Sequence, residues 1–142
     1  MLFNKFNHIV VKSPFDDRFL QTKNELGKYG ILNIERYSGK LGSNPEERER
    51  EATNDWWNIV QMAKDKNWDC VLILEDDIIV DERYVQFNEI VNNFLSNNTW
   101  DMFYFGYNDH QECQHITEPV SQNIVRIKKT WTLLLNDCQV IE

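Results

Sequence analysis

Short apolar runs along this chain alternate with longer amphipathic stretches. The most continuous run is Val71 to Leu74, which passes without a break into Glu75, Asp76 and Asp77. An unbroken apolar run of this length is typical of a strand buried on both faces, as in a parallel sheet covered by helices. Because extended residues alternate sides, we expect Glu75 and Asp77 to point one way and Asp76 the other.

The three consecutive carboxylates of residues 75–77 repel one another and resist desolvation, so they predict a positive partner nearby. A divalent cation, Mn²⁺ or Mg²⁺, is the simplest candidate because such ions take carboxylate and phosphate oxygens as ligands. The alternative interpretation is a solvated acidic turn that begins the next helix.

The remaining pattern predicts an alternation of strands and helices. We expect strands over residues 7–12, 31–37, 100–106, 123–127 and 130–135, helices over residues 16–29, 44–63 and 81–95, and a long polar loop over residues 107–120. Asn44 and Pro45 are a strong helix start, and Trp56 falls on the predicted apolar face of that helix. The order predicts one α/β domain over residues 1–142, with a mostly parallel sheet flanked by helices.

Polar residues follow several of the predicted strands. Ligands of α/β sheets bind outside the carboxyl ends of the strands. This rule brings Ser13, the Ser38–Gly39 turn, residues 75–77 and residues 107–110 to one edge of the sheet.

Composition narrows the classes of partner. The net charge of −8 and the pI near 4.9 argue against a nucleic-acid-binding face. An acidic protein that handles a phosphorylated ligand is expected to recruit a metal. We find no apolar run long enough for a membrane span and no apolar core of a signal peptide, so we expect no transmembrane segment. Three cysteines without metal-type pairing favour a reduced, cytoplasmic location.

Several blocks together resemble glycosyltransferases of family 25 and related GT-A-fold enzymes. The blocks are N-K-F-N-H-I-V-V-K-S-P-F-D-D-R at residues 4–18, residues 26–39, the helix with Trp56 and Trp57, D-C-V-L-I-L-E-D-D at residues 69–77 and W-D-M-F-Y-F-G at residues 100–106. The chain departs from the family at residues 52–55, Ala-Thr-Asn-Asp, where a small-Ser-His sequence is usual. Such a domain also continues beyond the position of Glu142, so we expect the acceptor part to be incomplete.

The resemblance implies a GT-A-like, three-layer α/β/α fold and a metal-dependent transfer of a sugar. The donor would be a nucleotide sugar, with a UDP-sugar favoured, and the acceptor a hydroxyl of a glycan, a lipid-linked sugar or a protein. It implies that Glu75 and Asp77 hold the cation. Asp76 would face the donor sugar or a backbone amide, and Ser13, Ser38 and Gly39 would lie near the nucleoside.

Two assignments keep an alternative. Arg18 could reach the diphosphate, or it could pair with Asp16 or Asp17 at the start of its helix. An inverting enzyme needs a base beside the acceptor hydroxyl, and Asp109 and His110 are the candidates. An ordinary polar loop is the other interpretation of these two residues.

Two other functions compete with the transferase. A degenerate module of the same fold would bind nucleotide without turnover. A phosphoryl-transfer protein, such as a receiver domain, also holds Mg²⁺ with aspartates at strand ends. A receiver, however, carries an acid pair after its first strand, where this chain has Lys12, Ser13 and Pro14.

Overall fold

The computed structural model describes residues 3, 5–105, 116–121, 124–129 and 138–141. The chain forms two compact units, Met1–Asn93 and Phe94–Glu142. The described residues have a mixed α/β fold with three helices and a three-stranded parallel sheet, as the alternation of elements predicted. The finer GT-A-like architecture stays a prediction.

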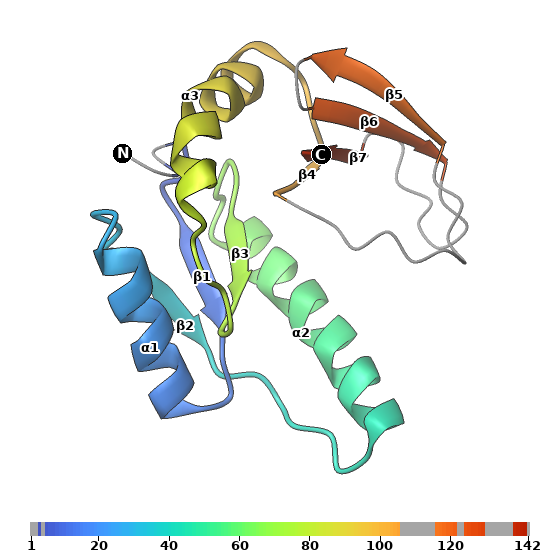
Figure 1. The fold of residues 1–142 in the computed structure, drawn as a ribbon. Helices are drawn as coiled ribbons and strands as arrows, with labels where there is room; N and C mark the ends of the chain where they lie inside the picture. The colour runs from blue at the N-terminus through green and yellow to red at the C-terminus, as the bar shows by residue number, and fades with distance from the viewer. Residues whose placement is uncertain (1–2, 4, 106–115, 122–123, 130–137, 142) are drawn as a thin grey trace. The chain divides into compact units, whose positions relative to one another are not determined.

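The first unit is built on the parallel sheet. Its elements are β1 (Ile9–Lys12), α1 (Asp16–Gly27), β2 (Glu35–Tyr37), α2 (Pro45–Asp65), β3 (Leu72–Glu75) and the first part of α3 (Glu82–Asn97). The strand order is β2-β1-β3, and β1 is parallel to both neighbours. The chain therefore moves to one side of β1 and then to the other. Right-handed crossovers in opposite directions put their helices on opposite faces, and Figure 1 shows α1 and α2 on either side of the sheet.

The core of this unit surrounds the middle strand. Val10 and Val11 of β1 are fully buried, which is why this short strand is apolar on both faces. Leu26 of α1 is also fully buried, as is Ile59 of α2. Burial of each such side chain stabilises the fold by about 1.5–3 kcal/mol relative to its exposure to water.

The start of α2 confirms the predicted capping. Asn44 has an extended backbone, and its side-chain oxygen accepts a hydrogen bond of 2.9 Å from the backbone N–H of Glu47. The side chain of Glu47 in turn accepts a bond of 2.8 Å from the backbone N–H of Ser43. The first bond satisfies one of the donors that a helix start leaves without a partner, and the second joins the preceding residue to the first turn.

Three local expectations were wrong. The first helix begins at Asp16 as expected, but it ends at Gly27 rather than near residue 29. The strand expected over residues 31–37 forms only over Glu35–Tyr37. Trp56 lies on the exposed side of α2, while its neighbour Asp55 is buried. Adjacent helical residues point about 100° apart, so a small error in the phase of the helix exchanges the two positions.

The second unit contains a separate mixed sheet. Its strands are β4 (Met102–Tyr104), β5 (Ile116–Ser121), β6 (Ile124–Lys129) and β7 (Cys138–Ile141), in the order β4-β7-β6-β5. The strand predicted over residues 123–127 is confirmed as β6, which pairs antiparallel with β5 and β7. The loop predicted over residues 107–120 is wrong where β5 forms. The strand predicted over residues 130–135 lies outside the described residues. In the part of the chain that the structure describes, no helix has the length and apolar character needed to cross a membrane.

Candidate ligand site at the carboxyl edge of the parallel sheet

The strands β1, β2 and β3 end at the same edge of their sheet, which we call the carboxyl edge (residues 12–15, 37–40 and 75–77). The order β2-β1-β3 places the topological switch point between β1 and β3. Ligands of doubly wound sheets bind at the carboxyl ends of the strands beside such a point. A ligand is therefore expected at the ends of β1 and β3.

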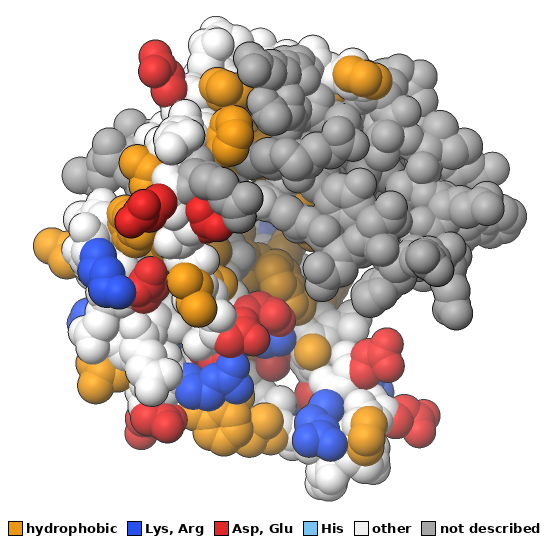
Figure 2. Space-filling view, viewed as in Figure 1, with side chains coloured by type: hydrophobic (Ala, Val, Ile, Leu, Met, Phe, Trp, Pro, Cys, Tyr) orange, Lys and Arg blue, Asp and Glu red, His pale blue; other side chains and the backbone are white. Residues whose placement is uncertain are grey.

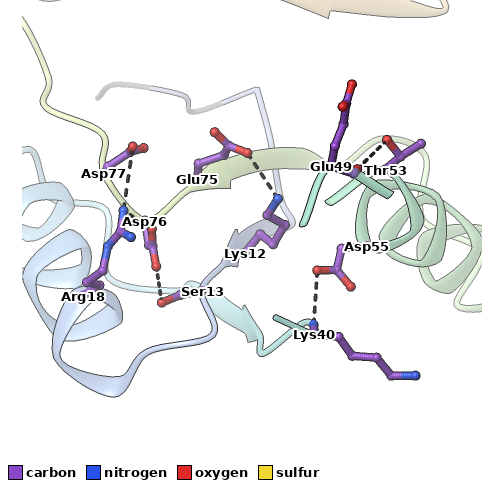
Figure 3. Close-up of polar contacts among 10 residues, drawn as sticks. All are labelled: Lys12, Ser13, Arg18, Lys40, Glu49, Thr53, Asp55, Glu75, Asp76 and Asp77. Atoms are coloured by element: carbon purple, nitrogen blue, oxygen red, sulfur yellow. Dashed lines mark hydrogen bonds and ion pairs between the residues drawn. The ribbon is translucent and has the colours of Figure 1, made fainter. Parts of the chain in front are cut away.

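A buried polar network joins these two strand ends to α1. Asp76 is only 9% exposed, and its Oδ2 accepts a hydrogen bond of 2.7 Å from the hydroxyl of Ser13. Its Oδ1 lies 2.7 Å from Nη2 of Arg18. Thr22 donates a hydrogen bond of 2.9 Å to the backbone carbonyl of Asp76. Both carboxylate oxygens of Asp76 therefore have partners within the protein (Figure 3).

The local sequence explains this network. Pro14 ends β1 directly after Ser13, because proline cannot donate to a strand ladder. The helix α1 then begins at Asp16, so that Arg18 and Thr22, four residues apart, lie on one helical face. Arg36 of β2 fixes the intervening turn. Its Nε donates a hydrogen bond of 3.0 Å to the carbonyl of Ser13, and its guanidinium also pairs with Asp16.

The other two acids of the tip are exposed. The side chain of Glu75 is 51% exposed and that of Asp77 is 68% exposed, against 8% for Asp76. This difference agrees with the predicted alternation, and Figure 3 shows Asp76 directed to Ser13, away from its two neighbours. The Nζ of Lys12 lies 3.2 Å from Glu75, and Nη2 of Arg18 lies 3.7 Å from Asp77. Acidic and basic side chains lie next to one another on the surface that Figure 2 shows.

These contacts exclude the pairing of Arg18 with Asp16 or Asp17, while its contact with a diphosphate stays a prediction. It pairs across the tip with Asp76 and Asp77, and not with the acids at the start of its own helix. Asp16 pairs with Arg36 instead. Arg18 is therefore held at the carboxyl edge, with its side chain 41% exposed.

The tip suits a divalent cation that is shared with a ligand. Among the described residues, no three side chains of His, Cys, Asp or Glu lie together as a metal-binding group. Mg²⁺, however, commonly takes one or two carboxylates and completes its shell with phosphate oxygens and water. Asp77 fits such a role, because its contact of 3.7 Å with Arg18 is long. Glu75 could bind a cation only after its ion pair of 3.2 Å with Lys12 is broken.

A second carboxylate lies at the end of β2. Asp55 of α2 is 5% exposed, and its Oδ2 accepts a hydrogen bond of 3.4 Å from the backbone N–H of Lys40. A Cβ atom at Gly39 would lie 2.3 Å from this oxygen, so the glycine permits the close approach. In the sequence, Asp55 stands out only as part of a departure from a family pattern. Its spacing from Ile59 and Ala63, four and eight residues on, was the signal that it faces the core.

The remaining predicted site residues divide into two groups. Ser38 is exposed next to Gly39 at the end of β2. Asp109 and His110 lie outside the described residues, and their role as a catalytic base stays a prediction. The structure thus brings Ser13, Arg18 and residues 75–77 together, and places Ser38 and Gly39 at the same edge.

Fold and site together describe an α/β protein with polar side chains gathered at the carboxyl edge of a parallel sheet. Comparison of the chain with models of protein families, with curated proteins and with solved structures gave no match.

Proposed function

We propose that this protein is a metal-dependent glycosyltransferase. It would move a sugar from a nucleoside diphosphate donor, with UDP-sugars favoured, to a hydroxyl of a glycan, a lipid-linked sugar or a protein. The proposal uses the resemblance of the sequence to GT-A-fold enzymes together with the arrangement of the carboxyl edge.

One observation carries the proposal. The buried carboxylate of Asp76 is bonded to Ser13 and Arg18 at the switch point, and this network fixes the backbone between two exposed acids. Glu75 and Asp77 are consequently displayed where doubly wound sheets bind phosphorylated ligands. A solvated acidic turn would leave all three acids exposed, whereas Asp76 is buried.

Glu75 and Asp77 would hold the divalent cation, with Asp77 the better placed of the two. When bound, the cation would supply Lewis-acid stabilisation of the charge on the departing nucleoside diphosphate. Lys12 and Arg18 lie beside the same acids. A cation on Glu75 would free the ammonium group of Lys12 to contact phosphate oxygens, whereas Arg18 would keep its contact of 2.7 Å with Asp76 and could offer only its remaining N–H groups.

The other roles follow the edge of the sheet. The Ser38–Gly39 turn would lie near the nucleoside. Asp76, Ser13 and Arg18 would support the tip, and Asp76 could contact the donor sugar only by giving up a partner that it has here. Asp109 and His110 stay the candidates for the base that an inverting enzyme needs.

The test measures hydrolysis and transfer with a panel of nucleotide sugars, in the presence of Mn²⁺ and of chelator. Binding of UDP is measured by calorimetry under the same conditions. Asp77→Asn should lower the affinity for Mn²⁺ with UDP at least about tenfold, because even the supporting groups of metal sites contribute about 10–100-fold. Asp69→Asn is the matched control, since Asp69 is an exposed acid near the opposite end of β3. Equal losses in both variants, or binding that does not need metal, would refute the proposal.

A non-catalytic nucleotide-binding module is the second candidate, because Lys12 and Arg18 already balance much of the charge of the tip. It predicts UDP binding without hydrolysis or transfer for every donor. A receiver-type protein would instead incorporate phosphate from acetyl phosphate at an aspartate. The strand order β2-β1-β3 also occurs in flavodoxin-like folds, so the assays, and not the sheet, separate these candidates.

A further inference from the structure

We propose that Asp55 of α2 binds the ribose hydroxyls of a nucleoside diphosphate at the carboxyl edge. The inference rests on the proposed function, since it assigns a residue to the nucleoside half of the same donor. Asp55 would be a binding residue, distant from the reacting bond.

The carboxylate of Asp55 is buried and has few partners among the described residues. Asp55 is 5% exposed, yet within the described residues no Lys, Arg or His nitrogen lies within 4.0 Å of it. Its one hydrogen bond, from the backbone N–H of Lys40, is long at 3.4 Å and reaches Oδ2 only. Buried carboxylates are normally paired or fully hydrogen-bonded, because burial of an uncompensated charge is costly. Asp55 therefore retains the capacity to accept further hydrogen bonds at Oδ1.

Asp55 and Glu75 lie on the same side of the parallel sheet. Ser13 and Asp76 point toward α1, as their bonds with Arg18 and Thr22 establish. Side chains alternate along a strand, so Lys12 and Glu75, which are register partners, point to the opposite face. That face is the one covered by α2 (Figure 1). Asp55 thus belongs to the same side of the sheet as the exposed Glu75.

The turn that follows β2 lies directly against the carboxylate of Asp55. Figure 3 shows Asp55 turned toward the backbone of Lys40, at the turn that follows β2. Gly39 in this turn has a φ of 64°, and any side chain there would collide with Oδ2. The following residues Leu41, Ser43 and Asn44 are exposed, so the segment that carries this turn lies at the surface. A ligand that binds beside Ser38 and Gly39 would reach the carboxylate by displacing this turn.

The position of Asp55 and its carboxylate favour the ribose as the part of the nucleotide that it binds. In doubly wound folds the diphosphate lies at the switch point, and an acidic side chain accepts hydrogen bonds from the ribose hydroxyls. Here the switch point lies between β1 and β3, and Asp55 lies one strand away, at the end of β2. Vicinal hydroxyls donate to a carboxylate, and such charge-assisted bonds are about twice as strong as neutral ones.

The experiment measures discrimination between ribose and deoxyribose. Calorimetry with Mn²⁺ present compares UDP with its 2′-deoxy and 3′-deoxy analogues on three proteins: the wild type, Asp55→Asn and Asp65→Asn. Asp65 is the matched control because it is an exposed acid on the same helix. The wild type and Asp65→Asn should bind UDP about tenfold tighter than at least one analogue, as expected for a hydrogen bond to a charged group. In Asp55→Asn the preference should fall below about threefold.

Unfolding in urea separates binding from a structural role. The amide oxygen of the Asn variant can still accept the N–H of Lys40, and the buried charge is gone, so its midpoint should equal or exceed that of the wild type. An unchanged preference for UDP in Asp55→Asn, or no preference in the wild type, would overturn the inference while leaving the transferase proposal standing. A wild type that binds no UDP would overturn both.

Discussion

Substitution of Asp76 tests whether the carboxyl edge is held by the network described above. The change Asp76→Ala removes the acceptor of the Ser13 hydroxyl at 2.7 Å and the partner of Arg18 at 2.7 Å. The Ser13 hydroxyl is not orphaned, because the carbonyl of Phe15 lies 2.8 Å away and can take its proton. Arg18 keeps water and the more distant Asp77 as partners.

These contacts determine how far Asp76→Ala should lower the free energy of unfolding. A buried hydrogen bond to a charged group contributes about 1.5–3 kcal/mol to stability. The pair with Arg18 contributes only about 0–1 kcal/mol, since the side chain of Arg18 is 41% exposed. We therefore expect Asp76→Ala to lower the free energy of unfolding by about 2–4 kcal/mol. Asp76→Asn should lower it by about half as much, because the amide can turn its oxygen to Arg18 and its N–H to Ser13.

Urea denaturation followed by circular dichroism measures the effect. With a slope of about 2 kcal/mol per molar urea, Asp76→Ala should lower the midpoint by about 1–2 M. Arg18→Met leaves the carboxylate of Asp76 buried without a positive partner at 2.7 Å, so it should lower the midpoint by a similar amount. A wild-type midpoint for Asp76→Ala would contradict the role of the network. A wild-type midpoint for Arg18→Met would contradict the pairing of Arg18 with the buried carboxylate.

Two further predictions concern features away from the tip. Asn44→Ala should lower the free energy of unfolding by about 1 kcal/mol, because the helix cap is lost. Asn54→Ala, at an exposed position in the interior of α2, is the control and should not lower it. Equal urea midpoints for the two variants would contradict the capping role of Asn44. Burial, together with the nearby charge of Asp69, raises the pKa of the Cys70 thiol, so less of it is thiolate at a given pH. In a variant with Cys113→Ser and Cys138→Ser, alkylation of Cys70 at pH 8 should be slower in the folded than in the urea-unfolded protein, and should accelerate at higher pH; equal rates would contradict this.

The parts of the fold that depend on neighbouring residues were predictable from the sequence. The apolar run before residue 75 predicted β3, and Asn44 with Pro45 predicted the start of α2. The alternation along an extended chain predicted that Asp76 would differ from Glu75 and Asp77, as their exposure shows. Each of these signals lies within a few residues of the feature that it predicts.

The contacts within the site could not be predicted in this way. Ser13 and Asp76 are 63 residues apart, and they meet only because β1 lies between β2 and β3 in the register that pairs Lys12 with Glu75. The choice of Arg18 between several nearby acids likewise depends on where the helix α1 lies against the sheet. A spacing rule contains neither the strand order nor the register.

The missed strand β5 has a different cause. Its sequence, Ile-Thr-Glu-Pro-Val-Ser, contains a proline and polar residues, which together favour a loop. In the sheet β4-β7-β6-β5, however, β5 has a partner on one side only, and an edge strand tolerates proline. The pairing with β6 is also irregular between Pro119 and Ser121. Tertiary position, which the local pattern does not contain, decides the outcome here.

The carboxyl edge therefore divides into two sides with different physical tasks. On the α1 side, Ser13 and Asp76 are buried and already have partners, so substitutions there should act mainly on stability. On the α2 side, Glu75 is exposed and paired with Lys12. Asp55 is buried and, within the described residues, has one long hydrogen bond, so substitution of Asp55 should act mainly on ligand binding. A ligand gains most from groups whose bonding capacity is unused, because displacing an existing short bond costs about as much as the new one contributes. We therefore propose that a nucleotide binds on the α2 side.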